Sequence, residues 1–375
     1  MELMLTTGCN LRCAYCTQKR SAPRTMAPEV VDAAIRQLVS SRYDRPRLIL
    51  FGGEPLLAAP LVRRALDRVR GWAPPRMRPE IQIVTNGTRL DEEMTALLVS
   101  RDVFITLSFD GVRMAQDHRG PGTFDDLDQV LLGFGRDHPS HLRRRLTVKV
   151  TLTSRNVACL SESFGYFLSR GVRDVELCPA LPDDPGWDAR SRLELGRQLA
   201  GVVTLSVDEY RRRGVIPLRV FRLATPRPTG ADAPACGCAG RSELFVDVDG
   251  TLAPCSRLAP STLGPQPGAI RRVVKSLGGL RVTTPGLSAA LVRREQRARR
   301  LPFLAGLNDQ RAPRGPCSRC EARSTCFVCP VAVACNGGRV PQFHCDVNRL
   351  FARYRSAFQR EAGLTPTRSC RGAWT

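Results

Sequence analysis

The chain has 375 residues, of which 42% are hydrophobic, and a formal net charge of +22. This size suits one large α/β domain followed by a smaller one, and no apolar run reaches the roughly 18 residues that a membrane helix needs. The positive charge is almost entirely arginine, because Lys19, Lys149 and Lys275 are the only lysines. Such a charge indicates either a compositional bias or a basic surface for an acidic partner, such as a peptide leader or RNA.

Strands and helices alternate along the first part of the chain. The expected strands cover residues 2–6, 47–51, 81–85, 103–109, 146–152 and 172–177, and the expected helices cover 28–41, 61–72, 124–134 and 160–170. This alternation predicts a parallel sheet with right-handed crossovers, that is, a partial barrel of six βα units. Functional residues in such a barrel are expected at the carboxyl ends of the strands.

The chain contains 15 cysteines and shows no secretory signal at its start. We therefore expect a cytoplasmic protein without a membrane partner, whose clustered thiols ligate a metal or an iron–sulfur cluster rather than form disulfides. No recognition domain is expected before the barrel, since the first strand begins at residue 2.

Three of these cysteines lie together in the loop after the first strand. Cys9, Cys13 and Cys16 have the spacing C-x3-C-x2-C, and Tyr15 precedes the last one. A [4Fe-4S] cluster usually takes four cysteines, so three leave one iron open to another ligand. The loop resembles that of the radical S-adenosylmethionine (SAM) enzymes. In that family the open iron chelates the amine and carboxylate of SAM, and electron transfer cleaves SAM to a 5′-deoxyadenosyl radical.

Glycines follow the second expected strand, where a ligand can approach the backbone closely. Gly52, Gly53 and Glu54 precede a proline, and this segment resembles the GGEP segment with which the family holds the SAM amino group. The Asn86-Gly87 pair ends the third strand. A role for Asn86 beside SAM is a weaker interpretation, because turn formation explains an Asn-Gly pair equally well.

Two further segments carry the same resemblance. Ser108 and Asp110 resemble the SxDG segment that lies beside SAM in the family. Arg119 resembles a common arginine whose planar fork can meet the SAM carboxylate. A solvated loop arginine is the alternative interpretation of Arg119. We place the end of the barrel domain at residue 213, so that it covers 1–213.

Residues 214–375 are expected to form a smaller, cysteine-rich domain. The segment ELFVDVDGTLAPC predicts a β-hairpin with Asp249-Gly250 at its turn. The spacing C-x11-G-x4-C from Cys238 to Cys255, followed by C-x2-C-x5-C-x2-C from Cys317, resembles the SPASM extension of radical SAM enzymes, which carries two auxiliary iron–sulfur clusters. A basic amphipathic helix at 346–361 is expected to pack against the rest of the protein.

The resemblance implies two sets of auxiliary ligands. The first set is Cys236, Cys238, Cys255 and Cys329, and the second is Cys317, Cys320, Cys326 and Cys345. The sequence departs from the family with two residues, where three are usual, between Cys326 and Cys329. In a second register, Cys326, Cys329 and Cys335 make the same motif, Arg339 replaces the last cysteine and one iron stays open. We prefer the first register because it fills every ligand position. A pair of structural zinc sites is the alternative for this half.

Four cysteines remain outside these sets, and we expect them to be structural thiols. They are Cys159, Cys178, Cys335 and Cys370.

The resemblance implies a radical SAM/SPASM enzyme that acts on a peptide or protein. The leading hypothesis is a maturase that forms a side-chain crosslink, or an oxidation, in a ribosomally made precursor peptide. An anaerobic sulfatase maturase that makes formylglycine is the alternative, but those enzymes usually carry Asp where this chain has Ser256. An RNA-modifying radical SAM enzyme would suit the charge, although no RNA-binding module is visible and nucleic acid is not an expected partner. The expected partners are the substrate, a reductant such as flavodoxin or ferredoxin, and a separate leader-recognition protein.

Overall fold

The structure is a computed structural model. It describes residues 1–18, 22–41, 43–222, 244–262, 279–287, 289–291, 293, 319–322, 325–326 and 328–364. The described elements are β1 (Glu2–Met4), α1 (Pro28–Val39), β2 (Arg47–Phe51), η1 (Pro55–Ala58), α2 (Ala59–Trp72), β3 (Glu80–Thr85), α3 (Glu92–Ser100), β4 (Phe104–Ser108), α4 (Arg113–Gln116), α5 (Thr123–Asp137), α6 (Pro139–Arg145), β5 (Leu146–Leu152), η2 (Val157–Cys159), α7 (Leu160–Ser169), β6 (Val175–Pro179), α8 (Ala189–Arg213), η3 (Arg219–Phe221), β7 (Phe245–Val246), β8 (Leu252–Ala253), η5 (Ser256–Leu258), α12 (Pro330–Cys335) and α13 (Gln342–Glu361). Among the described helices, none is long and apolar enough to cross a bilayer.

The chain divides into two compact units that are not continuous in sequence. The first unit comprises Met1–Leu107 and Pro234–Asp309, and the second comprises Ser108–Ala233 and Gln310–Thr375. The expected domain boundary after residue 213 stays a prediction.

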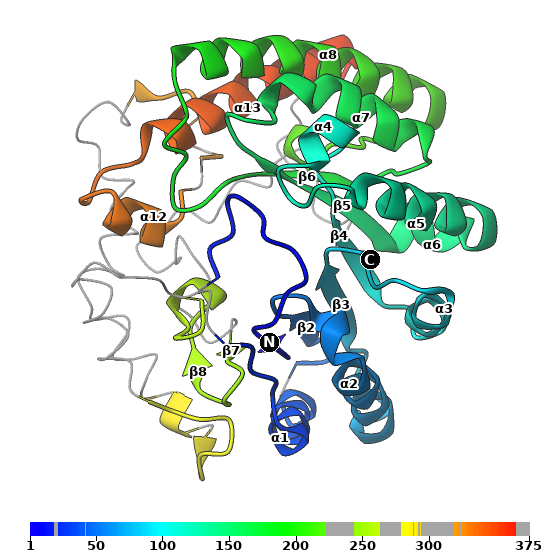
Figure 1. Ribbon diagram of the computed structural model, residues 1–375, viewed down its shortest axis with the longest axis vertical. Helices are drawn as coiled ribbons and strands as arrows, with labels where there is room; N and C mark the ends of the chain where they lie inside the picture. Colours follow the sequence, from blue (N-terminus) through cyan, green and yellow to red (C-terminus); the bar gives the residue numbers. More distant parts are fainter. Residues whose placement is uncertain are drawn as a thin grey trace. The chain divides into compact units, whose positions relative to one another are not determined.

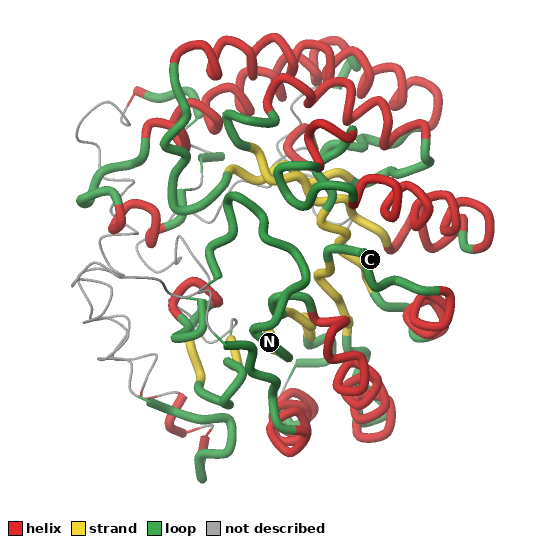
Figure 2. Tube along the Cα trace, in the orientation of Figure 1, coloured by secondary structure: helices red, strands yellow, loops and turns green. Residues whose placement is uncertain are grey.

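In the first unit, β1 to β4 form a parallel sheet in sequence order (Figure 1). Three apolar side chains on β1 and β2, Leu3, Leu48 and Leu50, are fully buried. Helix α1 buries residues at helical spacing, among them Val31 and Ile35, and it packs beside α2 (Figure 2). The predicted α/β alternation is therefore present here.

The hairpin of the cysteine-rich half belongs to this first unit. Strand β7 pairs in parallel with β1, on the edge that β2 leaves open, and β8 pairs antiparallel with β7. Phe245 packs in a small core with Met4 and against the ring of Phe51, at 6.1 Å between ring centroids. Gly250 has a φ of 87° in the turn, which favours glycine. The predicted hairpin is confirmed.

In the second unit, β6 pairs in parallel along its whole length with Val148–Leu152 of β5. Helix α13 packs against α8 (Figure 1), and the ring of Phe358 stacks on Phe221 with 5.2 Å between centroids. The predicted C-terminal packing helix is confirmed. It begins four residues earlier than expected, at Gln342, because Phe343 is buried beside Trp187 and extends the apolar face.

Several boundaries differ from the sequence-based expectations. Strand β6 begins at Val175 rather than at 172, because Gly171 has a φ of 82° and the chain turns there. Helix α3 was not expected, although Asp91 caps it by accepting a hydrogen bond from the Met94 amide at 2.7 Å. Helices α6 and α8 were not expected either.

Candidate active site

The three-cysteine loop leaves the carboxyl end of β1 and is closed at its base. The Thr7 amide donates to the Arg24 carbonyl at 2.9 Å, and the Met26 amide donates to the Leu5 carbonyl at 2.8 Å. Beyond this closure, Cys9 and Cys16 are exposed and Cys13 is half-buried. The loop therefore presents its thiols at the end of the strand where the fold predicts chemistry.

The donor set of this loop fits an iron–sulfur cube better than a single metal ion. A single zinc ion gathers its ligands within about 2.3 Å of one point, whereas a cube spreads its irons over separate corners. In the described part of the chain, no three Cys, His, Asp or Glu side chains are gathered closely enough to hold one ion. Three thiols on one loop, not converging on a point, are compatible with a cube that they hold at three corners.

Gly52 and Gly53 bring the end of β2 against this loop. The Gly53 amide donates to the Thr6 carbonyl and the Glu54 amide to the Gly8 carbonyl, both at 2.8 Å. A Cβ atom on Gly53 would lie 2.1 Å from the Gly8 oxygen, and one on Gly52 would lie 2.7 Å from the Thr6 oxygen. Contact between two backbone segments thus requires both glycines, whatever ligand approaches them.

The Glu54 carboxylate joins β2 to β3. Its Oε1 accepts from the Thr85 hydroxyl at 2.7 Å and the Leu56 amide at 3.1 Å, and its Oε2 accepts from the Asn86 amide at 2.6 Å. The side chain is buried, and burial raises the pKa of Glu54 while these donors oppose the rise. The Glu54 carboxylate therefore holds the segment after β2 against the end of β3. Sequence reasoning missed Thr85 as its partner.

Asp110 and Arg119 form a buried ion pair in the second unit. Arg119 Nη2 lies 2.9 Å from Asp110 Oδ1, with side-chain exposures of 8% and 0%. The same carboxylate oxygen accepts from the Thr151 amide at 2.9 Å, and the Asp110 amide donates to Gln116. The interpretation of Arg119 as a solvated loop residue is therefore wrong. Ser108 lies at the end of β4 and is half-buried.

The auxiliary-ligand candidates are only partly described. Cys236, Cys238 and Cys317 lie outside the described residues, as does Cys370. Cys255 is half-buried after β8, in the first unit. In the second unit, Cys320, Cys326, Cys329 and Cys345 are half-buried, and Cys335 is exposed at the end of α12. The choice between Cys329 and Cys335 stays a prediction.

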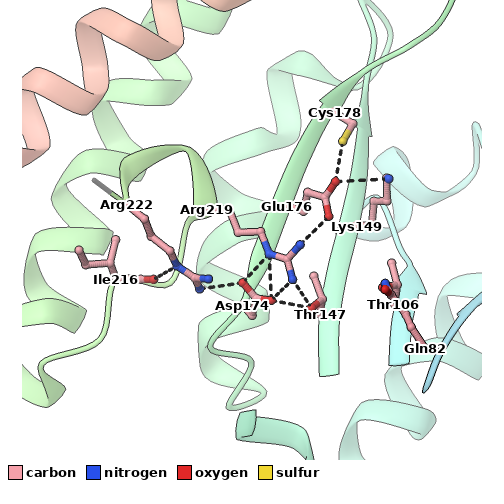
Figure 3. A network of polar contacts seen from close by, with 10 residues as sticks. All are labelled: Gln82, Thr106, Thr147, Lys149, Asp174, Glu176, Cys178, Ile216, Arg219 and Arg222. Atoms are coloured by element: carbon pink, nitrogen blue, oxygen red, sulfur yellow. Dashed lines mark hydrogen bonds and ion pairs between the residues drawn. The ribbon is translucent and has the colours of Figure 1, made fainter. Parts of the chain in front are cut away.

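A charged network, which the sequence reasoning missed, covers one face of β5 and β6 (Figure 3). Arg219 joins Asp174 and Glu176, at 2.9 Å to each, and Arg222 reaches Asp174 at 2.7 Å. The Cys178 thiol donates to Glu176 at 3.0 Å. Alternate polar residues along both strands were the available signal for this network.

The Cys178 thiol lies at this network, and its structural role stays a prediction. Burial, above all, raises the pKa of Cys178 to about 12. In the metal-free protein the thiol therefore keeps its proton at physiological pH.

Comparison with known proteins identifies the class. Residues 3–132 match the Radical SAM superfamily model. A cysteine-type anaerobic sulfatase-maturating enzyme of Clostridium perfringens strain 13 is 20% identical over 272 residues, which cover 67% of this chain and 72% of the relative. A GTP 3′,8-cyclase of Mycobacterium sp. strain KMS is 26% identical over 270 residues, covering 68% and 74%. The solved structure of native anSMEcpe with bound AdoMet and Kp18Cys peptide superimposes with a TM-score of 0.70 at 16% identity, covering 97% of this chain and 98% of that chain.

The chain thus has the fold of enzymes that bind an iron–sulfur cluster together with SAM. Residues 3–132 carry a radical SAM domain, and this domain implies an enzyme that uses a [4Fe-4S] cluster and SAM. The predicted fold, a radical SAM barrel followed by a cysteine-rich C-terminal region, is confirmed.

Proposed function

We propose that the chain is a maturase that forms a crosslink, or oxidises a side chain, in a ribosomally made precursor peptide. The observation that carries the proposal is the match of fold, over nearly the whole chain, to an enzyme solved with both AdoMet and a peptide. When bound, the cluster and SAM supply a 5′-deoxyadenosyl radical that removes a hydrogen atom from an unactivated C–H bond.

The residues of the candidate site have separate tasks in this proposal. Cys9, Cys13 and Cys16 hold the cluster. The backbone of Gly52 and Gly53 binds the SAM amine, and the Glu54 carboxylate keeps that backbone in place through its contacts with β3. Ser108 lies beside SAM.

Arg119 binds the SAM carboxylate in this proposal. Asp110 acts through Arg119 as a positioning residue, because its Oδ1 accepts from the guanidinium and from the Thr151 amide.

The cysteine-rich half holds two auxiliary [4Fe-4S] clusters in this proposal, with the two ligand sets given above. Clusters held there would supply an acceptor for the electron that the oxidised substrate gives up, or they would only support the substrate site. A reductant such as flavodoxin or ferredoxin supplies the electron for the first cluster, in the reducing cytoplasm that a chain with 15 clustered cysteines favours.

Formylglycine formation in a sulfatase is the second candidate, and the named sulfatase-maturating relative favours it. Ser256 argues against it, because this residue follows Cys255 at the start of η5 and offers a hydroxyl where a carboxylate is usual in such enzymes. A hydroxyl is a far weaker base than a carboxylate.

Iron content tests the cofactor part of the proposal. We expect about twelve irons per chain after anaerobic reconstitution and about eight in the Cys9/Cys13/Cys16→Ala variant, since each cube holds four. Cys329→Ala should lose a cluster and Cys335→Ala should not. About four irons, falling to none in the triple variant, would overturn the assignment of auxiliary clusters.

Product analysis tests the reaction. The reduced holoenzyme is incubated with SAM and either an acidic precursor peptide or a sulfatase peptide with a cysteine. We expect 5′-deoxyadenosine and a loss of two hydrogen atoms from the precursor, with binding that weakens as salt rises. A hydrazide-reactive aldehyde on the sulfatase peptide alone would favour the second candidate.

A further inference from the structure

Asn86 links the end of β3 to the cysteine loop. Its side chain is buried, with 7% of the residue exposed. Its Nδ2 donates to Asn10 Oδ1 at 3.0 Å and lies 3.9 Å from Cys9 Sγ. Asn10 Nδ2 donates to the Thr88 hydroxyl at 2.7 Å, and that hydroxyl donates back to Asn86 Oδ1 at 2.8 Å. The three side chains form a closed ring next to the sulfur.

The hydrogen-bond partners of the Asn86 side-chain amide determine which of its ends is the oxygen and which is the nitrogen. The Thr88 backbone amide donates to Asn86 Oδ1 at 3.1 Å, and a backbone N–H can only donate. The oxygen must therefore face Thr88, and the NH2 group must face Asn10 and Cys9. The Asn86 backbone is itself held by Glu54 at 2.6 Å, so the side chain starts from a fixed position.

Cys9 thus receives two N–H groups. The Leu11 amide donates to Cys9 Sγ at 3.4 Å, as a local feature of the loop, and Asn86 approaches the same sulfur from another strand. Hydrogen bonds to cluster sulfurs help to set the reduction potential of an iron–sulfur cluster. The reason is that N–H dipoles stabilise the extra negative charge of the reduced form.

We propose that Asn86 is a positioning residue that directs an N–H group at the Cys9 thiolate and thereby raises the reduction potential of the SAM cluster. This role requires no particular substrate, so it is independent of the maturase proposal. The Asn-Gly pair, which the sequence explains as a turn, then has a second function through its asparagine.

The test is an anaerobic redox titration of the holoenzyme, in which the cluster signal that responds to SAM is followed by electron paramagnetic resonance. Asn86→Asp keeps the acceptor for Thr88 but replaces the NH2 group with oxygen. Asn86→Ser also removes the N–H group without adding charge, and its hydroxyl can still accept from Thr88. At a fixed potential we expect the reduced-to-oxidised ratio to fall about tenfold in Asn86→Asp, equal to ~59 mV for one electron, and to a smaller extent in Asn86→Ser.

Two controls separate tuning from loss of structure. Asn10→Ala removes the ring partner but leaves the Asn86 contact with sulfur, so we expect a smaller shift than in Asn86→Ser. Iron per chain should be unchanged in the variants that are compared, and if Asn86→Asp fails to load, Asn86→Ser decides the question. A fully loaded Asn86→Ser with the wild-type midpoint potential would overturn the proposal, because any shift in Asn86→Asp would then come from charge alone.

Discussion

Removal of Arg119 should destabilise the protein far more than removal of Arg113, although both arginines pair with an aspartate in the second unit. Arg119 and Asp110 are 8% and 0% exposed, whereas Arg113 and Asp125 are 54% and 66% exposed. Arg119→Ala would leave the Asp110 carboxylate buried without the guanidinium. Breaking a buried pair in this way costs about 3–5 kcal/mol. Arg113→Ala breaks only a solvated pair, and its effect should lie near the error of the measurement.

Thermal unfolding of the reconstituted enzyme, followed by circular dichroism, measures this difference. At ~2–4 °C per kcal/mol for a unit of this size, Arg119→Ala should lower the Tm by roughly 6–20 °C. The double variant Asp110→Asn/Arg119→Ala should recover part of the lost stability, because the neutral amide leaves no unpaired charge in the interior.

Two outcomes would refute the reasoning. The first is an Arg119→Ala variant as stable as Arg113→Ala, which would mean that the Asp110 charge does not need its partner. The second is a double variant less stable than Arg119→Ala, which would mean that packing or the Thr151 amide contact, rather than the unpaired charge, determines the cost.

Three further predictions concern the loop, a thiol and an ion pair. Gly53→Ala should abolish SAM binding and cluster loading, because the new Cβ would lie 2.1 Å from a carbonyl oxygen. Equilibrium dialysis measures the binding and iron content measures the loading. The control Gly71→Ala, in helix α2, should leave both unchanged, because no atom lies within 4 Å of its Cβ position. Cys178 should react more slowly with iodoacetamide at pH 8 than free cysteine does, since burial raises its pKa to about 12, and rapid labelling located by mass spectrometry would contradict this. The hydrogen bond from Arg64, the largest cause, lowers the pKa of Asp32. Asp32 therefore stabilises the fold above the ordinary carboxylate pKa and loses this effect as pH falls through its depressed pKa, so Asp32→Asn should lower the Tm at pH 7 and change it little at pH 2.

The strands with the clearest limits in sequence were predicted at their observed bounds. RLILF gives β2 at Arg47–Phe51, and LTVKVTL gives β5 at Leu146–Leu152. In both, apolar or β-branched residues are bounded by polar segments, so local pattern and burial agree. Helix α8 was not predicted, because its mean hydropathy is low. Its buried residues are determined by contacts with α7 and α13, which are distant in sequence or not evident from it.

Within the site, the sequence predicts which residues take part, but it does not predict which of them contact one another. The cysteine spacing and the Gly-Gly-Glu segment are local signals, read from adjacent letters. The contact of Glu54 with Thr85 spans 31 positions, and that of Asn86 with Cys9 spans 77. Such pairs follow from the register of parallel strands, which places the ends of β1, β2 and β3 together only after folding.

This arrangement explains why motif residues alone are poor probes of the chemistry. Gly53 and Glu54 bind the loop through their backbone amides, and the Glu54 carboxylate satisfies donors from β3, so buried polar groups are paired without any cofactor. A substitution at either position disturbs the architecture and the ligand site together. Cys9 lies on the exposed side of the loop closure, and the Asn86 NH2 group faces its sulfur, whereas the Asn86 backbone amide belongs to the framework through Glu54. Substitutions there change the surroundings of the sulfur while the framework persists, and they are the ones that separate cluster chemistry from the fold that supports it.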